Sequence, residues 1–240
     1  MNIVARIRSS PRELLLFAAA ALTLGMGFSM VDSTFNNFLD FNFHLTGFQR
    51  SFLEFPREVP GFLVVFVSAA FGFLCSRRLG ALAMIFGAVG TLLLGFASTQ
   101  YGVMVLWLFI LSMGQHLYMP IASTIGMELA QAGQDGRRLG QLNAIRNFAA
   151  ILGSFIVFLG FQYLGFTFQH TYTLAAILLT LAAVLLFSMK PTPVAEKRGF
   201  LQFHKEYRLY YALNVLSGAR KQLFITFAPW VLVSILGQPK

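Results

Sequence analysis

Long apolar runs separated by short polar segments make up most of the chain, and they predict a series of membrane-spanning helices. The first run extends from Leu14 to Leu39 and follows an arginine-containing segment, residues 1–13. This start resembles a secretory signal peptide, but no small-residue cleavage site follows it and further apolar runs come later. We therefore expect an uncleaved first transmembrane helix.

The second predicted helix lies in the stretch Thr46 to Gly80 and runs from Thr46 to Arg78. Thr46 and Gln49 have the spacing of a capping box, charged residues share one face of the next turns, and residues 62–74 are apolar. At ~1.5 Å per residue this helix would be on the order of 48 Å long, more than the ~30 Å hydrocarbon core. We expect it to cross the membrane and to carry charge partway into it.

Five more helices are predicted, at about residues 81–97, 102–125, 139–164, 172–189 and 208–236. A polar loop over residues 128–138 separates the fourth helix from the fifth. The predicted fold class is an all-α polytopic membrane protein with three parts: a six-helix N-terminal bundle over 1–190, a basic cytoplasmic linker over 191–207, and a seventh helix over 208–240 that begins an incomplete C-terminal bundle.

Lysine and arginine gather in the segments 1–13, 76–78, 137–146 and 190–208, all on one side of the predicted topology. The positive-inside rule then places the N-terminus in the cytoplasm. A multi-pass protein of the plasma membrane, the inner membrane of a bacterium, is the expected localisation. The net charge of +9 follows from this topology, because the basic residues lie between apolar runs and form no nucleic-acid-binding face.

The composition supports a membrane protein and offers no catalytic site. Of the 240 residues, 57% are hydrophobic and only 11% are charged, more apolar surface than a soluble chain of this length can bury. Cys75 is the single cysteine, so the chain forms no internal disulfide and has no cysteine-based metal site. We find no metal-ligand cluster, nucleotide loop or nucleophile with a base, and we predict neither an enzyme nor a cofactor.

Ionisable and polar residues inside the predicted helices are the candidates for solute binding or coupling. Each charge near the membrane centre costs roughly 2.5 to 3.5 kcal/mol and needs a partner or a water-filled cavity. The candidates are Asp32, Asn36, Glu54, Arg57, Glu58, Gln115, His116, Arg220 and Lys221. Glu54, Arg57 and Glu58 fit equally a salt-bridge set in the outer leaflet. The alternative for Asp32 is an ordinary carboxylate at the membrane interface, and the alternative for His116 is a hydrogen-bonding group between helices.

The seventh helix contains two adjacent cations after a Ser217-Gly218 break. Arg220 and Lys221 point about 100° apart on a helix, so at least one should meet an acid of another helix or an anionic ligand. Alternatively, the helix starts after Lys221 and both cations lie in the linker.

Two further sets of residues have a predicted structural role. The cytoplasmic gate would consist of Arg77, Arg78, Asn143, Arg146 and Asn147, with Glu128 or Asp135 as partners of the last three. Small residues allow membrane helices to approach closely, which is the predicted role of Gly25, Gly27, Gly87, Gly90, Gly153 and Gly160.

The segment Gly72 to Gly80, GFLCSRRLG, resembles the Gly-x-Leu-x-Asp-Arg-x-Gly-Arg-Arg signature between helices two and three of the major facilitator superfamily. The six helices, the basic linker and the restarting helix also resemble that family. Four features differ: Ser76 or Arg77 replaces the aspartate, Ala81 replaces the arginine after Gly80, Ile110 stands where a fourth-helix arginine would be, and Asn147 to Gly153 contains no proline. Proton coupling and antiport therefore stay open.

The resemblance implies secondary active transport of a small solute by alternating access between two helical bundles. The chain would then be a truncated transporter, its N-terminal half plus the seventh helix. The expected partners are a small-molecule solute, the lipid bilayer, and a missing C-terminal half or a second copy, without nucleic acid. The alternative is a non-transporting membrane interaction or scaffold protein derived from a half-transporter.

Overall fold

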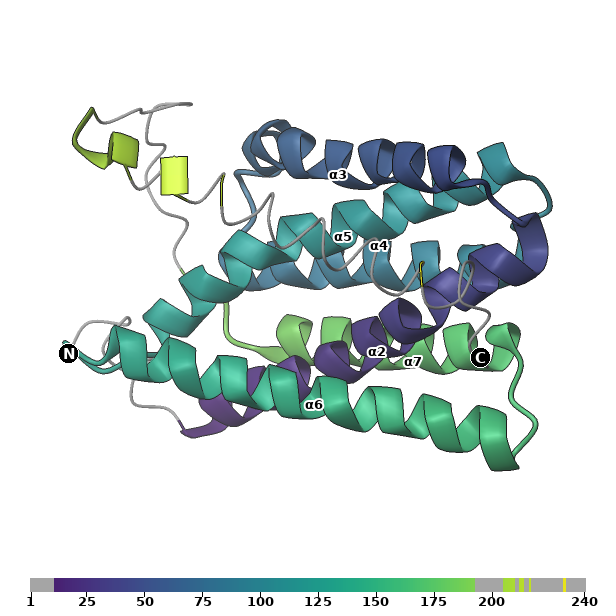
Figure 1. Ribbon diagram of the computed structural model, residues 1–240. Coiled ribbons are helices and arrows are strands. Elements are labelled where there is room, and N and C mark those ends of the chain that lie inside the picture. The colour runs from purple at the N-terminus through teal and green to yellow at the C-terminus, as the bar shows by residue number, and fades with distance from the viewer. Residues whose placement is uncertain (1–10, 193–204, 210–211, 214–215, 217–230, 232–240) are drawn as a thin grey trace.

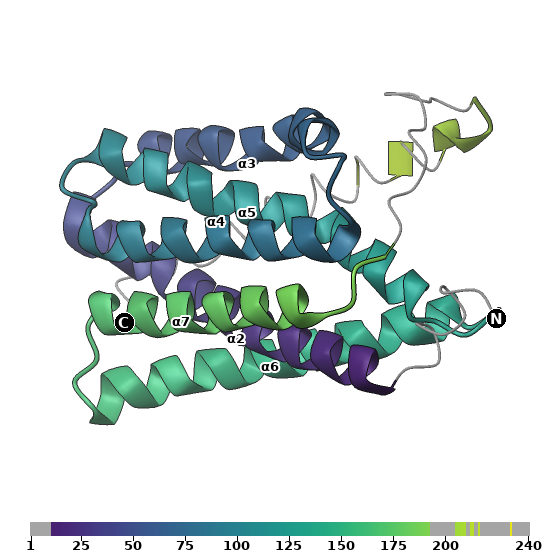
Figure 2. The same cartoon turned by 180° about the vertical axis from the view of Figure 1, so that it is seen from behind.

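The computed structural model describes residues 11–192, 205–209, 212–213, 216 and 231. This part of the chain contains six long α-helices, which lie side by side and alternate in direction (Figures 1 and 2). They are α2 (Pro11–Phe43), α3 (Gly47–Ala70), α4 (Ser76–Phe96), α5 (Tyr101–Glu128), α6 (Asp135–Tyr163) and α7 (Phe168–Ser188), followed by a short 3-10 helix, η1 (Lys205–Tyr207).

Five of these helices, α2, α4, α5, α6 and α7, are long and apolar enough to cross a membrane. The chain is therefore an integral membrane protein with an all-helical fold. Helix α3 is not among the five, because its first half contains Arg50, Glu54, Arg57 and Glu58. Its predicted passage through the membrane stays a prediction.

The single helix predicted from Thr46 to Arg78 is wrong. The capping box at Thr46 is present, but α3 ends at Ala70 and the chain turns before α4 starts at Ser76. In the turn the amide of Gly72 donates to the carbonyl of Ala69, three residues back instead of four, and Cys75 is extended. A glycine at this point weakens the helix, and the Arg77-Arg78 pair consequently begins α4 instead of ending α3.

The loop predicted over residues 128–138 is shorter in the structure. Helix α5 continues to Glu128, and α6 already begins at Asp135, an acidic residue that suits the positive end of a helix. Gly133 has a φ of 75° and allows the sharp turn between them. The linker and seventh helix predicted over 191–240 lie mostly outside the described residues, and so do Arg220 and Lys221.

Glycines bring the helix backbones together, as predicted for several of them. A Cβ atom on Gly25 would lie 2.8 Å from the carbonyl oxygen of Arg146, and one on Gly153 would lie 2.6 Å from that of Met26, so α2 and α6 cross closely. A Cβ atom on Gly90 would collide with the backbone of Leu111 in α5. These three close-packing predictions are confirmed.

Helix α2 has one side packed in the apolar core of the bundle. Helix α4 packs against α5 and α7, α2 packs against α6 and α7, and α3 packs against α5. Buried apolar side chains, including Met84, Leu117 and Leu179, fill the contacts among α2, α4, α5 and α7. Asn36 and Asp32 of α2 contact α3, and Ser29 of α2 contacts α6.

Candidate functional site

Helix α3 presents an arginine and a glutamate that are largely buried. Arg50 is 1% exposed, and its Nη1 lies 2.5 Å from Oε1 of Glu54, one turn further along the helix. Its Nε donates to Oδ1 of Asn36 in α2 at 3.1 Å. These contacts satisfy a buried guanidinium, which is otherwise costly in an apolar environment.

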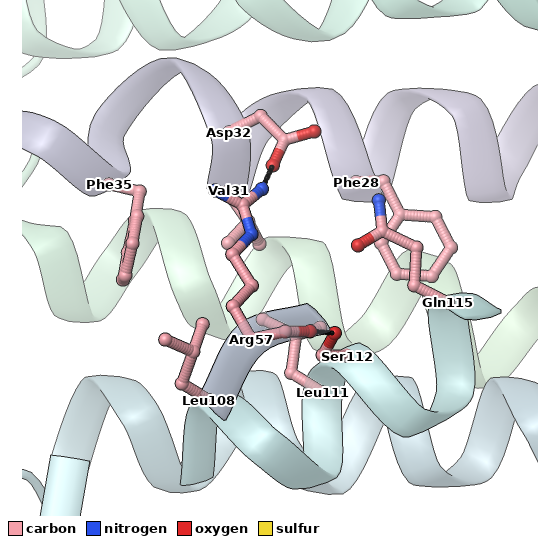
Figure 3. Close-up of a pocket in the computed structure, with 9 residues that line it drawn as sticks. All are labelled: Phe28, Val31, Asp32, Phe35, Arg57, Leu108, Leu111, Ser112 and Gln115. Atoms are coloured by element: carbon pink, nitrogen blue, oxygen red, sulfur yellow. Dashed lines mark hydrogen bonds and ion pairs between the residues drawn. The ribbon is translucent and has the colours of Figure 1, made fainter. Parts of the chain in front are cut away.

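Arg57 extends this cluster to a second acid. Its Nη1 lies 3.7 Å from Oε1 of Glu54, and its Nη2 lies 3.4 Å from Oδ1 of Asp32 in α2 (Figure 3). The guanidinium also stands 5.7 Å from the centre of the Phe35 ring. Two arginines and two acids thus form one electrically balanced network, consisting of Arg50, Glu54, Arg57 and Asp32, that connects α3 to α2.

A second polar contact connects α3 to α5. The Nε2 atom of His116 lies 3.3 Å from Oε2 of Glu58, and its Nδ1 lies 3.0 Å from the hydroxyl of Ser112. The same hydroxyl donates to the backbone carbonyl of Arg57 (Figure 3). A Cβ atom on Gly61 would lie 3.1 Å from the His116 ring, so the glycine makes room for the histidine.

Beside this network, α2, α5 and α6 enclose an open cavity of about 470 Å³. Its wall combines polar and apolar side chains. The lining residues include Phe28, Ser29, Asp32, Ser33, Gln115, Tyr118, Met119, Arg146, Asn147 and Ser154. A second space of about 10 Å³, enough for roughly one water, lies next to it, and Phe28, Asp32 and Gln115 line both (Figure 3).

The close crossing of α2 and α6 fixes the shape of the cavity wall. The hydroxyl of Ser29 donates to the carbonyl of Ala150 at 2.6 Å and lies 2.8 Å from the hydroxyl of Ser154. Because Gly25 and Gly153 allow this approach, the exposed side chains of Asp32 on α2 and Arg146 on α6 line one cavity.

The structure brings together every predicted binding or coupling residue that it describes. Asp32, Asn36, Glu54, Arg57 and Glu58 lie in or beside the charged network. Gln115 lines the cavity and His116 pairs with Glu58.

Four of the five predicted gate residues separate into two groups. Arg77 is fully buried, 3.2 Å from Oε2 of Glu128, and Arg78 donates to the carbonyl of Phe187 while its guanidinium covers that ring at 3.7 Å. Arg146 and Asn147 instead line the cavity, and the acid predicted as a possible partner, Glu128, pairs with Arg77. The exposed Asn143 lines neither of the two spaces.

Sequence analysis missed several residues of the site. Arg50 has an i, i+4 spacing to Glu54, which was a usable signal. The serines of the cavity and of the histidine contact, Ser29, Ser33, Ser112 and Ser154, carry no such signal, since serine is common in packed membrane helices. Among the described residues no three histidine, cysteine or acidic side chains converge as metal ligands.

Comparison with known proteins shows similarity in structure but not in sequence. No protein-family model matches the chain, and no curated protein does. An auto-inhibited peptide transporter of the POT family superposes with a TM-score of 0.58 at 15% identity, covering 78% of this chain and 40% of that chain. A D-xylose-proton symporter superposes with a TM-score of 0.54 at 16% identity, covering 92% of this chain and 55% of that chain.

The two transporters establish the fold of this chain. The chain has a helical arrangement found in secondary transporters, and it spans about half the length of the symporter and less of the peptide transporter. At sequence identities of 15% and 16%, the similarity is evidence for the fold alone.

Proposed function

We propose that the chain is a helical bundle of a secondary active transporter of the major facilitator type, which moves a small solute by alternating access. The observation that carries this proposal is the polar cavity between α2, α5 and α6, with Asp32 and Arg146 in its wall. Charged residues on membrane helices are costly and usually mark solute or ion pathways. In transporters of this kind the binding site lies where two bundles meet.

Alternating access needs a second bundle to rock against the first. The share of each solved transporter that the chain covers, 40% and 55%, supports the proposal that this bundle is one of two. The second would come from further polypeptide or from a second copy of the chain. A cytoplasmic N-terminus and the plasma membrane, the inner membrane of a bacterium, belong to the same proposal.

Two ionisable contacts are the proposed coupling elements. Asp32 pairs with Arg57 between α2 and α3, and Glu58 pairs with His116 between α3 and α5. Protonation of either acid would weaken its contact, and α3 would then pack differently against the rest of the bundle. A change in protonation would in this way shift the bundle between two arrangements.

Uptake into proteoliposomes tests the transport proposal. The chain, and the chain extended by any reading frame beyond the Lys240 codon, is incubated with a mixture of metabolites, and the internal solutes are identified by mass spectrometry. Solute accumulation by wild-type protein that falls about tenfold in Asp32→Asn supports transport through the cavity. Asp135, considered above as a gate partner, is exposed in the first turn of α6, lines neither space and forms no ion pair with another described residue. It provides the matched control Asp135→Asn, which should transport normally.

Protein-free liposomes set the background for this measurement. Accumulation that exceeds the background only for the extended chain would assign transport to two bundles together. Equal solute content in all protein samples and in protein-free liposomes would contradict the transport proposal. It would favour the alternative of a membrane interaction or scaffold protein.

A further inference from the structure

We propose that the cavity between α2, α5 and α6 binds a small organic carboxylate, with Arg146 as the residue that receives the carboxylate group. This inference rests on the proposed function and names the substrate class of the same site.

Among the described charged residues around the cavity, Arg146 is the one that has no ion-pair partner. Arg50 and Arg57 offset Asp32 and Glu54. The side chain of Arg146 takes part in no ion pair and no hydrogen bond with another described residue. It is exposed and lines the cavity. A guanidinium on a membrane helix needs an anionic or polar partner. An arginine in the cavity wall that has no carboxylate partner among the described residues favours an anionic ligand.

The position of Arg146 is fixed by the fold. Its carbonyl oxygen lies at the crossing of α2 and α6, where a Cβ atom on Gly25 would be 2.8 Å away. The backbone that carries the guanidinium is therefore held against α2, three residues before the buried Ala149. A site on two tightly packed helices keeps its geometry better than a site on a loop.

Neutral polar groups accompany the arginine. The amides of Asn147 and Gln115 and the hydroxyls of Ser33 and Ser154 belong to the same wall. Guanidinium binds a carboxylate through two parallel hydrogen bonds, and the neighbouring amides of Asn147 and Gln115 supply further donors. The hydroxyls of Ser33 and Ser154 already donate to Ser29 and add polar surface to the wall. This combination suits a carboxylate with additional polar groups.

The rest of the wall and the size of the cavity favour an organic anion over a bare inorganic ion. Leu24, Phe28 and Met119 provide apolar surface, and the volume is about 470 Å³. Sites for small organic molecules measure roughly 300 to 1,000 Å³ and are mostly apolar, with a few placed polar groups.

Protection of Arg146 from chemical modification tests the inference. The full chain in lipid nanodiscs is treated with phenylglyoxal, which modifies arginine, and the rate at each arginine is read by peptide mass spectrometry. The probes are benzoate and succinate, each compared with its neutral amide, benzamide or succinamide, at equal ionic strength. Arg137, exposed in the first turn of α6 and outside the cavity, is the internal control.

We expect benzoate or succinate to slow modification of Arg146 about threefold or more, as an occupancy of about two-thirds or more would do. The rate at Arg137 should stay constant, and the amides should protect neither arginine. Equal protection by acid and amide, equal protection of both arginines, or no protection by either acid would overturn the inference.

The labelling needs no transport, so the two proposals fail separately. Specific protection of Arg146 without solute uptake would support the anion site and contradict transport by the chain. Uptake of a neutral solute, with Arg146 unprotected by either acid, would leave transport intact and overturn the carboxylate assignment.

Discussion

Arg57 of α3 and Asp32 of α2 form an ion pair in which Nη2 and Oδ1 lie 3.4 Å apart. Asp32 also lines the cavity, where its side chain is 52% exposed, whereas Arg57 is 18% exposed. The pair thus joins an accessible acid to a largely buried cation that also contacts Glu54. A solute that displaced the Asp32 side chain would break its ion pair with Arg57 and so remove a contact between α2 and α3.

Replacement of Arg57 should destabilise the bundle according to the charge that is lost. Arg57→Gln leaves Asp32 and Glu54 with less compensation, and we expect it to lower the free energy of unfolding by about 2 to 3 kcal/mol, less than a fully buried pair would lose. Arg57→Lys keeps the charge but lacks the forked guanidinium group that reaches both acids. We therefore expect it to lower the free energy of unfolding by about half as much. Thermal unfolding followed by circular dichroism in detergent measures both.

A matched control separates the network from a general effect of removing arginine. Arg137 is exposed in the first turn of α6, and Arg137→Gln should change stability by less than about 0.5 kcal/mol. If Arg57→Gln unfolds at the same temperature as Arg137→Gln, the network between α2 and α3 does not stabilise the fold.

The helices were predictable because their signal is local. Apolar runs longer than a bilayer thickness indicate membrane helices regardless of their neighbours, and α2, α5, α6 and α7 appear at the expected places. The break between Ala70 and Ser76 was missed for the same reason. The apolar run continues through the break. At Gly72 the backbone hydrogen bond reaches three residues back instead of four, and this change does not alter the pattern of apolar and polar residues.

The site was predictable as a set of residues but not as a set of partners. A charge in a membrane helix must be compensated, which identified Asp32, Glu58 and His116. Which cation meets which acid depends on how the helices cross. Arg146 was expected at a gate, yet the close approach of Gly25 brings it to the cavity of Asp32.

Glu58 and His116 should behave as one unit in a double-mutant cycle. Their side chains lie 3.3 Å apart and join α3 to α5. We expect Glu58→Gln and His116→Gln each to lower the unfolding temperature. The loss of stability in the double variant should be smaller than the sum of the losses in the two single variants. A coupling energy of about 0.5 to 1.5 kcal/mol is reasonable for neighbours in contact.

The control for this cycle pairs His116→Gln with Asp135→Asn, because Asp135 lies at the exposed start of α6. Distant substitutions are additive within about 0.3 to 0.5 kcal/mol. Additivity of Glu58→Gln with His116→Gln to the same accuracy would mean that the contact contributes nothing to the fold.

Glu128 should be essential for the burial of Arg77. The guanidinium is fully buried with none of its nitrogens in a well-aligned hydrogen bond, and its compensation is the carboxylate of Glu128 at 3.2 Å. Glu128→Gln leaves that cation uncompensated and should cost about 3 to 5 kcal/mol. The double change Arg77→Met with Glu128→Gln removes both charges and should recover most of the loss, as measured by thermal unfolding.

The prediction for this pair fails if the double variant is less stable than Glu128→Gln alone. Ser76, whose hydroxyl donates to the other oxygen of Glu128 at 3.0 Å, provides a milder comparison. Ser76→Ala removes one hydrogen bond and keeps the ion pair, so it should cost only about 1 kcal/mol.

Gly114, like Gly90, should be among the glycines that tolerate a methyl group least. A Cβ atom there would collide with the carbonyl oxygen of Ala83 and lie 2.5 Å from the amide nitrogen of Gly87, and both are main-chain atoms of α4. Main-chain atoms cannot move without separating the helices, so Gly114→Ala should cost about 2 kcal/mol or more. At Gly126 a Cβ atom would meet only side-chain atoms of Leu139 and Leu142, which can rotate away, and Gly126→Ala should cost less.

Gly140 of α6 is the matched control for helix propensity, because nothing lies within 4 Å of a Cβ atom built on it. Gly140→Ala should stabilise the protein by about 0.5 to 1 kcal/mol, since alanine restricts the unfolded chain and favours the helix. Unfolding temperatures in the order Gly140→Ala, wild type, Gly126→Ala, Gly114→Ala would establish that α4 and α5 are held at backbone contact. A Gly114→Ala variant as stable as Gly140→Ala would mean that the two helices lie further apart.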